Sequence, residues 1–290
     1  MYYRLLAINI DGTLLRSNGR LQKGVKEAIQ FVQNKDVYVT LITGRNFLSA
    51  QKVAKALKID SVLVTLNGAF IANSIDRPIY VNGLSEERTF NIVQVLENYD
   101  CNIRLIHEKF SLGNRKRATE NIVAKAVLNS GDPLFYPLQF VDSLGDHLRD
   151  NPVSALKIEV YFSNKDEKEK VEETISKAFP TLSILAHIEN KIEIIPEGVS
   201  KLNGLKRLGE HIGIHLNEMV AIGYAIDDLP IVKKVGLGVA MWDSPNEVKK
   251  AADWITRTSN QQGVTYMIKE HFRKQQRKEF LREVSRSGDN

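Results

Sequence analysis

Short apolar runs alternate with amphipathic stretches in the first quarter of the chain. The apolar runs have the length of buried strands, and the stretches between them repeat apolar residues at helical spacing. This pattern predicts strands at 4–9, 37–42 and 61–65, separated by helices at 23–35 and 47–57. Strands that alternate with helices are typical of a parallel sheet with crossover helices.

The same alternation returns after Pro196. It predicts helices at 201–212, 227–235 and 245–252, and strands at 219–223, 237–241 and 254–256. We therefore expect both ends of the chain to build one doubly wound α/β core with a parallel sheet.

The pattern of apolar and polar residues changes at about Gly83, in the segment that lies between the two parts of the core. Helices are expected at 85–99 and 165–179, strands at 103–106, 156–162 and 192–195, and residues 110–150 show little periodicity. The chain thus predicts a core domain of 1–83 and 193–267, an inserted α+β cap domain of 84–192, and a basic C-terminal tail of 268–290.

Composition fits an ordinary globular enzyme-sized protein. The chain has 290 residues, of which 43% are hydrophobic and 26% charged, and no apolar run reaches membrane-spanning length. A single cysteine, Cys101, cannot form an internal disulfide, and we expect it to be a filler thiol in a reducing compartment. These features favour a cytoplasmic protein without membrane contact.

The net charge of +5 is concentrated at the C-terminus. Residues 269–290 hold seven Lys and Arg against four Asp and Glu, which leaves +3 of the total there. A solvated basic helix is the expected form of this tail. No series of aromatic residues accompanies the charge, so a nucleic-acid partner is disfavoured, whereas a protein partner for the tail stays open.

Candidate chemistry lies in loops that follow predicted strands. In an open α/β sheet, ligands bind beyond the carboxyl ends of the strands. Four segments fall there: Asn9-Ile10-Asp11-Gly12-Thr13, Thr43-Gly44-Arg45, the surroundings of Lys201, and residues 223–228.

In order and spacing, these segments resemble the haloacid dehalogenase superfamily of phosphohydrolases, and its Cof-type branch in particular. The resemblance runs from about residue 3 to 267 and includes residues 64–69, 194–201 and 238–241. It implies a large cap domain in the insertion and a Mg²⁺-dependent phosphatase that acts on a small phosphorylated metabolite, such as a sugar phosphate.

The resemblance also implies roles for individual residues. The family's first loop reads Asp-x-Asp-Gly-Thr, in which the first Asp is the nucleophile and a metal ligand. The second, Asp11 here, is the general acid and base, and its backbone carbonyl binds the metal. Thr43 matches the residue that hydrogen-bonds the phosphoryl group, and Lys201 matches the lysine that neutralises developing charge.

The phosphate-binding set is completed by residues of the same loops. Backbone N–H groups near glycines can hold an anion, which assigns Gly12 and Gly44 to this set. Arg45 and Asn67, which follow the second and third predicted strands, are added to it.

Two positions depart from the family at the metal site. Asn9 stands at the nucleophile, and an amide is a far weaker nucleophile and metal ligand than a carboxylate. Tyr224 stands where the family has a metal-binding Asp, while Asp228 keeps the outer acidic position and Asp227 replaces an Asn. Trp242 also replaces a small residue, and we expect either a narrowed site mouth or a packing role.

Two functions from different classes remain open. The first is a phosphatase-like hydrolase with impaired activity, which needs either residual chemistry at Asn9 or an alternative nucleophile such as water activated by Asp11. The second is a pseudo-phosphatase that binds a phosphometabolite or a protein partner without turnover. Catalytic turnover compared with stoichiometric binding discriminates between them.

Overall fold

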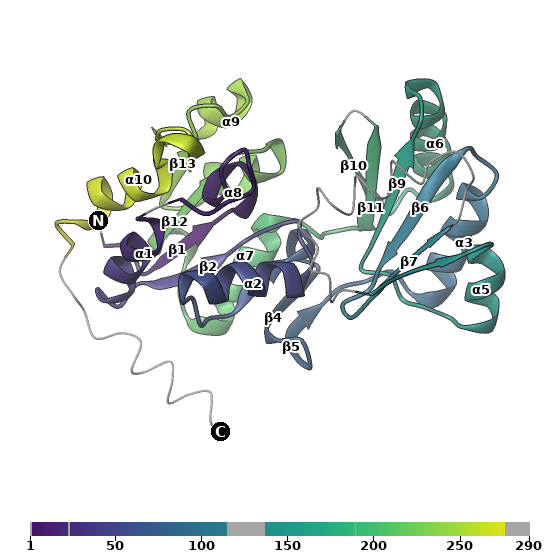
Figure 1. Cartoon of the computed structure of the whole chain (residues 1–290), viewed down its shortest axis with the longest axis horizontal. Helices are drawn as coiled ribbons and strands as arrows, with labels where there is room; N and C mark the ends of the chain where they lie inside the picture. The colour runs from purple at the N-terminus through teal and green to yellow at the C-terminus, as the bar shows by residue number, and fades with distance from the viewer. Residues whose placement is uncertain (1, 23, 115–136, 189, 276–290) are drawn as a thin grey trace. The chain divides into compact units, whose positions relative to one another are not determined.

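The computed structural model describes residues 2–22, 24–114, 137–188 and 190–275 (Figure 1). The chain divides into two compact units. The first comprises Met1–Gly44, Ala50–Ile79 and Ser200–Asn290, and the second comprises Arg45–Ser49 and Tyr80–Val199. The domain limits given above remain predictions, and most of the basic tail lies outside the described residues. No helix in the described part of the chain is long and apolar enough to cross a membrane.

Five parallel strands form the main sheet of the first unit: β1 (Leu5–Ile8), β2 (Tyr38–Leu41), β12 (Met219–Gly223), β13 (Leu237–Ala240) and β14 (Trp254–Ile255). Their order is β14-β13-β12-β1-β2. All four residues of β1 are fully buried, so both faces of this strand are covered. The predicted parallel α/β core is confirmed.

The first unit also contains α1 (Val25–Gln33), α7 (Lys201–Ile212), α8 (Leu229–Lys234), α9 (Asn246–Ala251) and α10 (Gly263–Phe272). Helix α2 (Phe47–Leu57) begins in the second unit and ends in the first. Helix α1 packs beside α10, and α7, α8 and α9 pack in a row. The helix expected at 227–235 starts later, because a 3₁₀ turn at Ile226–Asp228 precedes α8 and Pro230 occupies its first turn.

A second, smaller sheet corrects part of the expected topology. Strands β3 (Leu63–Thr65), β4 (Phe70–Ser74) and β5 (Arg77–Val81) form it, and β3 pairs antiparallel with β4. The predicted strand 61–65 joins the main sheet through a parallel bridge between Ile42 and Val64 and through hydrogen bonds such as that of the Thr43 N–H to the carbonyl of Val64 (2.9 Å). The sequence pattern did not predict β4 and β5.

The second unit contains a six-stranded sheet: β6 (Cys101–Ile106), β7 (Ser111–Asn114), β8 (Leu138–Val141), β9 (Lys157–Phe162), β10 (Leu182–Ile188) and β11 (Lys191–Pro196). The strand order is β10-β11-β9-β6-β7-β8, and only the β7–β8 pair is parallel. Strands β7 and β8 lie within residues 110–150, where no period was visible, and β10 was not predicted.

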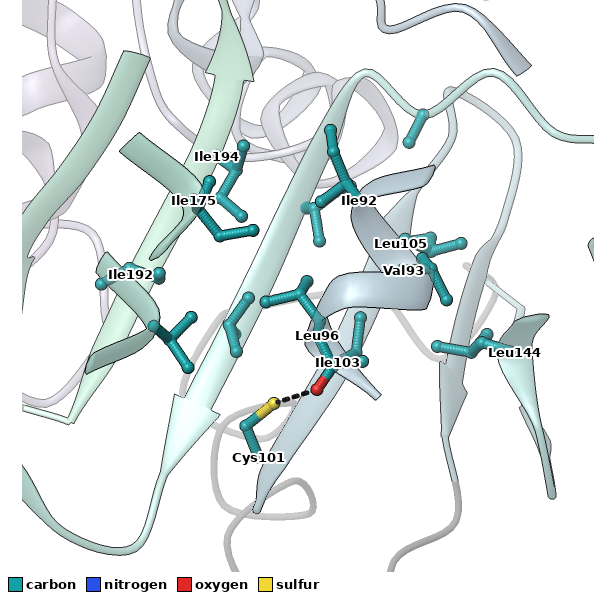
Figure 2. Close-up of a cluster of buried hydrophobic side chains, with 14 of the residues drawn as sticks. Ile92, Val93, Leu96, Cys101, Ile103, Leu105, Leu144, Ile175, Ile192 and Ile194 are labelled. Atoms are coloured by element: carbon teal, nitrogen blue, oxygen red, sulfur yellow. Dashed lines mark hydrogen bonds between the residues drawn. The ribbon is translucent and has the colours of Figure 1, made fainter. Parts of the chain in front are cut away.

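One face of this sheet is apolar and packs against α3 (Glu86–Leu96), α5 (Leu144–Asp150) and α6 (Lys165–Ala178). Figure 2 shows Leu96 of α3 close to Ile103 of β6 in this cluster. The thiol of Cys101 is buried at its edge and donates to the carbonyl of Leu96 (3.4 Å). Alternating strand residues thus supply the unit with an ordinary hydrophobic core.

The alternate residues of the same strands carry a buried ion network. The Nζ atoms of Lys157 and Lys191 lie 2.9 and 2.8 Å from Glu159, and Lys191 also contacts Glu193 at 2.7 Å. Burial alone would raise the pKa of Glu159, but the lysines and Arg104 hold it well below its usual value. The charges of this face are therefore paired rather than solvated.

Candidate functional site

Three loops meet at the carboxyl edge of the main sheet. Asn9 follows β1, Gly223 ends β12 and Thr43 follows β2 after one further residue, and these strands are neighbours. The backbone N–H of Asn9 donates to the carbonyl of Ile222 (3.1 Å), and that of Ile42 donates to Ile8 (3.0 Å). Side chains far apart in the sequence are thereby brought to one edge.

The first loop is a tight π-type turn that Asn9 caps. Asn9 is 3% exposed, and its Oδ1 accepts from the backbone N–H of Ile10 (2.8 Å). Its Nδ2 donates to the carbonyl of Asp11 (3.2 Å) and to Oδ2 of Asp228 (2.7 Å). Gly12 has φ of +70°, a left-handed conformation that lets the chain turn away from the strand. The side chain of Asp11 faces solvent, since this residue is exposed.

Lys201 is fixed at the first position of α7. The hydroxyl of Ser200 caps this helix by accepting from the N–H of Asn203 (3.2 Å). Lys201 is 3% exposed, and its Nζ lies 2.6 Å from Asp228 and 2.9 Å from Asp227. Burial lowers the pKa of the Lys201 ammonium, but the two carboxylates outweigh it and raise that pKa above its usual value.

Asp228 is the centre of the cluster and is completely buried. Its Oδ2 accepts from Asn9 and from the backbone N–H groups of Tyr224 (2.8 Å) and Ala225 (3.0 Å). Its Oδ1 accepts from Lys201. Burial raises the pKa of the Asp228 carboxyl, while Lys201 opposes that shift.

The ring of Tyr224 lies directly over the first loop. A β-carbon added to Gly12 would lie only 2.4 Å from Cδ1 of Tyr224. Only a glycine therefore fits beneath the ring, and the side chain at position 224 covers the loop.

Thr43, Gly44 and Asn67 form the other side of the candidate site. Thr43 is fully buried, and its carbonyl accepts from the N–H of Asn67 (3.0 Å). A β-carbon on Gly44 would lie 3.0 Å from Oδ1 of Asn67, and one on Gly68 would lie 2.5 Å from the carbonyl of Ser200. Small residues thus let this loop pack closely on the start of α7.

Arg45 and Trp242 are the remaining candidates from the sequence. Arg45 belongs to the second compact unit, where its Nη1 donates to Oγ of Ser49 (3.4 Å). Trp242 follows β13 and is 65% exposed, which is incompatible with a buried packing role.

The family that the sequence resembles uses Mg²⁺, so the side chains of this cluster are compared with the ligands that the ion requires. Among the described residues, no group of three or more His, Cys, Asp or Glu side chains is arranged to hold a metal ion. Asn9 turns an N–H₂ group, not an oxygen, towards Asp228. Mg²⁺ requires oxygen ligands in octahedral geometry, so the donor set present does not fit it.

Sequence reasoning missed three contributors to this arrangement. Ser200 positions Lys201, and the signal was a serine immediately before a predicted helix. The backbone N–H groups of Tyr224 and Ala225 hold Asp228, and no side-chain pattern could indicate them.

The sequence of this chain is similar to those of known proteins over nearly its whole length. The sequence profile of the haloacid dehalogenase-like hydrolase family matches residues 6–268. The stress response protein YhaX of Bacillus subtilis (strain 168) is 52% identical over 281 residues, with 97% of both chains covered. A 5-amino-6-(5-phospho-D-ribitylamino)uracil phosphatase of the same organism, YcsE, is 27% identical over 266 residues, which cover 92% of this chain and 94% of YcsE.

Solved structures agree with the fold. A haloacid dehalogenase-like hydrolase from Bacteroides thetaiotaomicron superposes with a TM-score of 0.81 at 23% identity, covering 92% of this chain and 99% of its own. The subclass IIB sugar phosphatase BT4131 superposes with a TM-score of 0.77 at 19% identity, covering 93% and 98%. At these identities the likeness concerns the fold.

Proposed function

Since this chain belongs to the haloacid dehalogenase-like hydrolase family, we propose that it is a phosphatase-like protein with strongly impaired turnover. Its ligand is a small phosphorylated metabolite, such as a sugar phosphate. The proposal has two parts, retained binding of the phosphoryl group and loss of the chemical step, and different residues support each part.

Binding is supported by the groups that remain at the sheet edge. The ammonium of Lys201 is buried and charged, and Thr43 with the N–H groups near Gly12 and Gly44 offers neutral donors to an anion. In the free protein the carboxylate of Asp227 forms an ion pair with the ammonium of Lys201, and the side chain of Asp227 is 26% exposed. A phosphate group competes with this carboxylate for Lys201, because both are anions.

The loss of chemistry is carried by one observation, the amide of Asn9. An amide oxygen is a poor nucleophile, and here it accepts from the N–H of Ile10. The remaining route is attack by water with Asp11 as the base, since the Asp11 side chain is exposed to solvent. That route lacks covalent catalysis, so turnover is slow.

A second candidate function is binding without any turnover. The contact of 2.7 Å between Asn9 and Asp228 favours it, because this contact fixes the amide away from an attacking position. The protein would then report on a phosphometabolite or regulate a partner. A partner for the basic tail of 268–290 and a cytoplasmic location stay predictions.

Phosphate release from a panel of phosphorylated metabolites tests the proposal. The unmodified chain is compared with the Asn9→Asp, Tyr224→Asp double variant, both with Mg²⁺. We expect full turnover from the double variant, partial turnover from Asn9→Asp alone because Tyr224 remains, and very slow turnover from the unmodified chain. Rapid turnover by the unmodified chain would contradict the assigned role of Asn9. If the unmodified chain released no phosphate at all, the binding function would be favoured.

A further inference from the structure

The inference starts from the oxygens that surround the Asn9 amide. Nδ2 of Asn9 lies 3.2 Å from the carbonyl oxygen of Asp11 and 2.7 Å from Oδ2 of Asp228. Both belong to the residues that the family resemblance assigned to a metal ion. An N–H₂ group has two protons, and this geometry uses one on each oxygen.

The orientation of the amide is determined by its neighbours. Oδ1 accepts from the backbone N–H of Ile10 at 2.8 Å. The reverse orientation would place an oxygen against the carbonyl of Asp11 and the carboxylate of Asp228, and an N–H₂ group against the N–H of Ile10. The hydrogen-bond network therefore places the positive end of the amide dipole between Asp11 and Asp228.

Four hydrogen-bond donors already surround the Asp228 carboxylate. A carboxylate offers about four acceptor positions. Oδ2 accepts from the Asn9 amide and from the backbone N–H groups of Tyr224 and Ala225, and Oδ1 accepts from the ammonium of Lys201, so a divalent ion at either oxygen would compete with donors already in place. Asp228 is also 0% exposed and makes no contact with bulk solvent.

The space around the loop is closed as well. A β-carbon on Gly12 would lie 2.4 Å from the ring of Tyr224, so the ring is in contact with the loop backbone. Mg²⁺ in proteins keeps several water ligands. The ring of Tyr224 occupies space beside the loop that such water ligands would need.

We propose that this site is built to work without a divalent metal. The amide of Asn9 links the first loop to Asp228 by hydrogen bonds, as a bound cation would link them electrostatically. The site is therefore complete, and competent to hold a phosphate anion, in the absence of Mg²⁺. The part of this inference that concerns the anion rests on the proposed function, whereas the part that concerns the metal does not.

Calorimetric titration of Mg²⁺ into the unmodified chain is the direct test. We expect no saturable heat, and thermal unfolding midpoints that are equal in Mg²⁺ and in EDTA. The Asn9→Asp, Tyr224→Asp variant should gain a saturable Mg²⁺ response, because it places two carboxylates beside Asp228. Asn217→Asp is the matched control, since it makes the same chemical change at an exposed position of the first unit.

The outcomes are separable. One-to-one Mg²⁺ binding by the unmodified chain overturns the inference, whatever the variants do. Titration with inorganic phosphate then tests the anion, and we expect equal dissociation constants in EDTA and in Mg²⁺. A tenfold loss of phosphate affinity in EDTA also overturns it. Absence of phosphate binding under both conditions contradicts the proposed function and leaves the Mg²⁺ result standing.

Discussion

Replacing Lys201 by methionine removes the only side-chain cation that contacts Asp228 among the described residues. Lys201 is 3% exposed and Asp228 is 0% exposed, so neither charge is stabilised by water. Methionine keeps most of the volume of the lysine stem. The Lys201→Met variant therefore isolates the loss of the charge from the loss of packing.

The expected cost follows from the geometry of the pair. At 2.6 Å, two unit charges attract by about 6 kcal/mol if the effective dielectric constant is about 20. Part of this is offset by desolvation, and removing one partner of a buried pair costs about 3–5 kcal/mol. Three N–H groups still donate to Asp228, so we expect a loss near the lower end, about 3 kcal/mol.

Urea unfolding followed by tryptophan fluorescence measures this loss of stability in the first compact unit, which contains Lys201 and Asp228. Both tryptophans of the chain, Trp242 and Trp254, belong to the first compact unit. Lys206→Met, at an exposed position of the same helix, is the control and should change stability by less than about 0.5 kcal/mol.

A double-mutant cycle separates charge pairing from other effects. Adding Asp228→Asn to Lys201→Met removes the stranded charge, so the double variant should lose less than the sum of the two single losses. A loss below about 1 kcal/mol for Lys201→Met alone, or additive losses in the cycle, would refute the reasoning.

Three further predictions follow from the same contacts. Asp227→Asn should improve the affinity for inorganic phosphate about fivefold by calorimetry, because a competing and partly exposed carboxylate leaves Lys201; weaker binding would contradict it. Gly12→Ala should destabilise the first unit in urea by more than the roughly 1–2 kcal/mol of a left-handed alanine, and Tyr224→Ala should relieve the excess. The depressed pKa of Glu159 means that its ion pairs stabilise the second unit above its usual pKa of 4.5 and lose this contribution as pH falls below it. An acid titration by circular dichroism should therefore be shallower for Glu159→Gln, and identical curves would argue against the network.

The core could be predicted because its strands are apolar on both faces. Residues 5–8 and 219–223 are continuous apolar runs and 37–42 contain a single polar residue, Thr40, and this is what a buried parallel strand requires. Their loops then carry Asn9, Thr43 and the 223–228 segment to one edge without further information.

The elements that were missed lack such a signal. Strand β5 is largely exposed, so no apolar pattern marks it. Strand β7 reads Ser-Leu-Gly-Asn, and its polar residues are buried against Arg104 and other polar groups of the sheet. Burial of polar residues depends on partners from distant strands, and a local window does not contain them.

The same limit applies to the site. Sequence alone indicated that Asn9 and Asp228 belong to one edge of the sheet. It did not indicate that the Asn9 amide donates to Asp228, because these residues are 219 positions apart. The direction of an amide depends on the acceptors around it, and those are set by the folded loops.

The segment inserted between the two parts of the core affects the order in which the strands can pair while the chain is being synthesised. Arg4 and Glu218 form a salt bridge of 3.0 Å although 214 positions separate them, and β1 needs both β2 and β12 as neighbours. At a synthesis rate of about 5–20 residues per second, β1 waits roughly 10–40 seconds for β12. The contiguous segment Tyr80–Val199 holds every strand of its own sheet and emerges complete during that interval. Strand β1 is thus made first, but its edge towards β12 stays unpaired until the insertion has been synthesised, and nascent-chain chaperones should protect that edge during this delay.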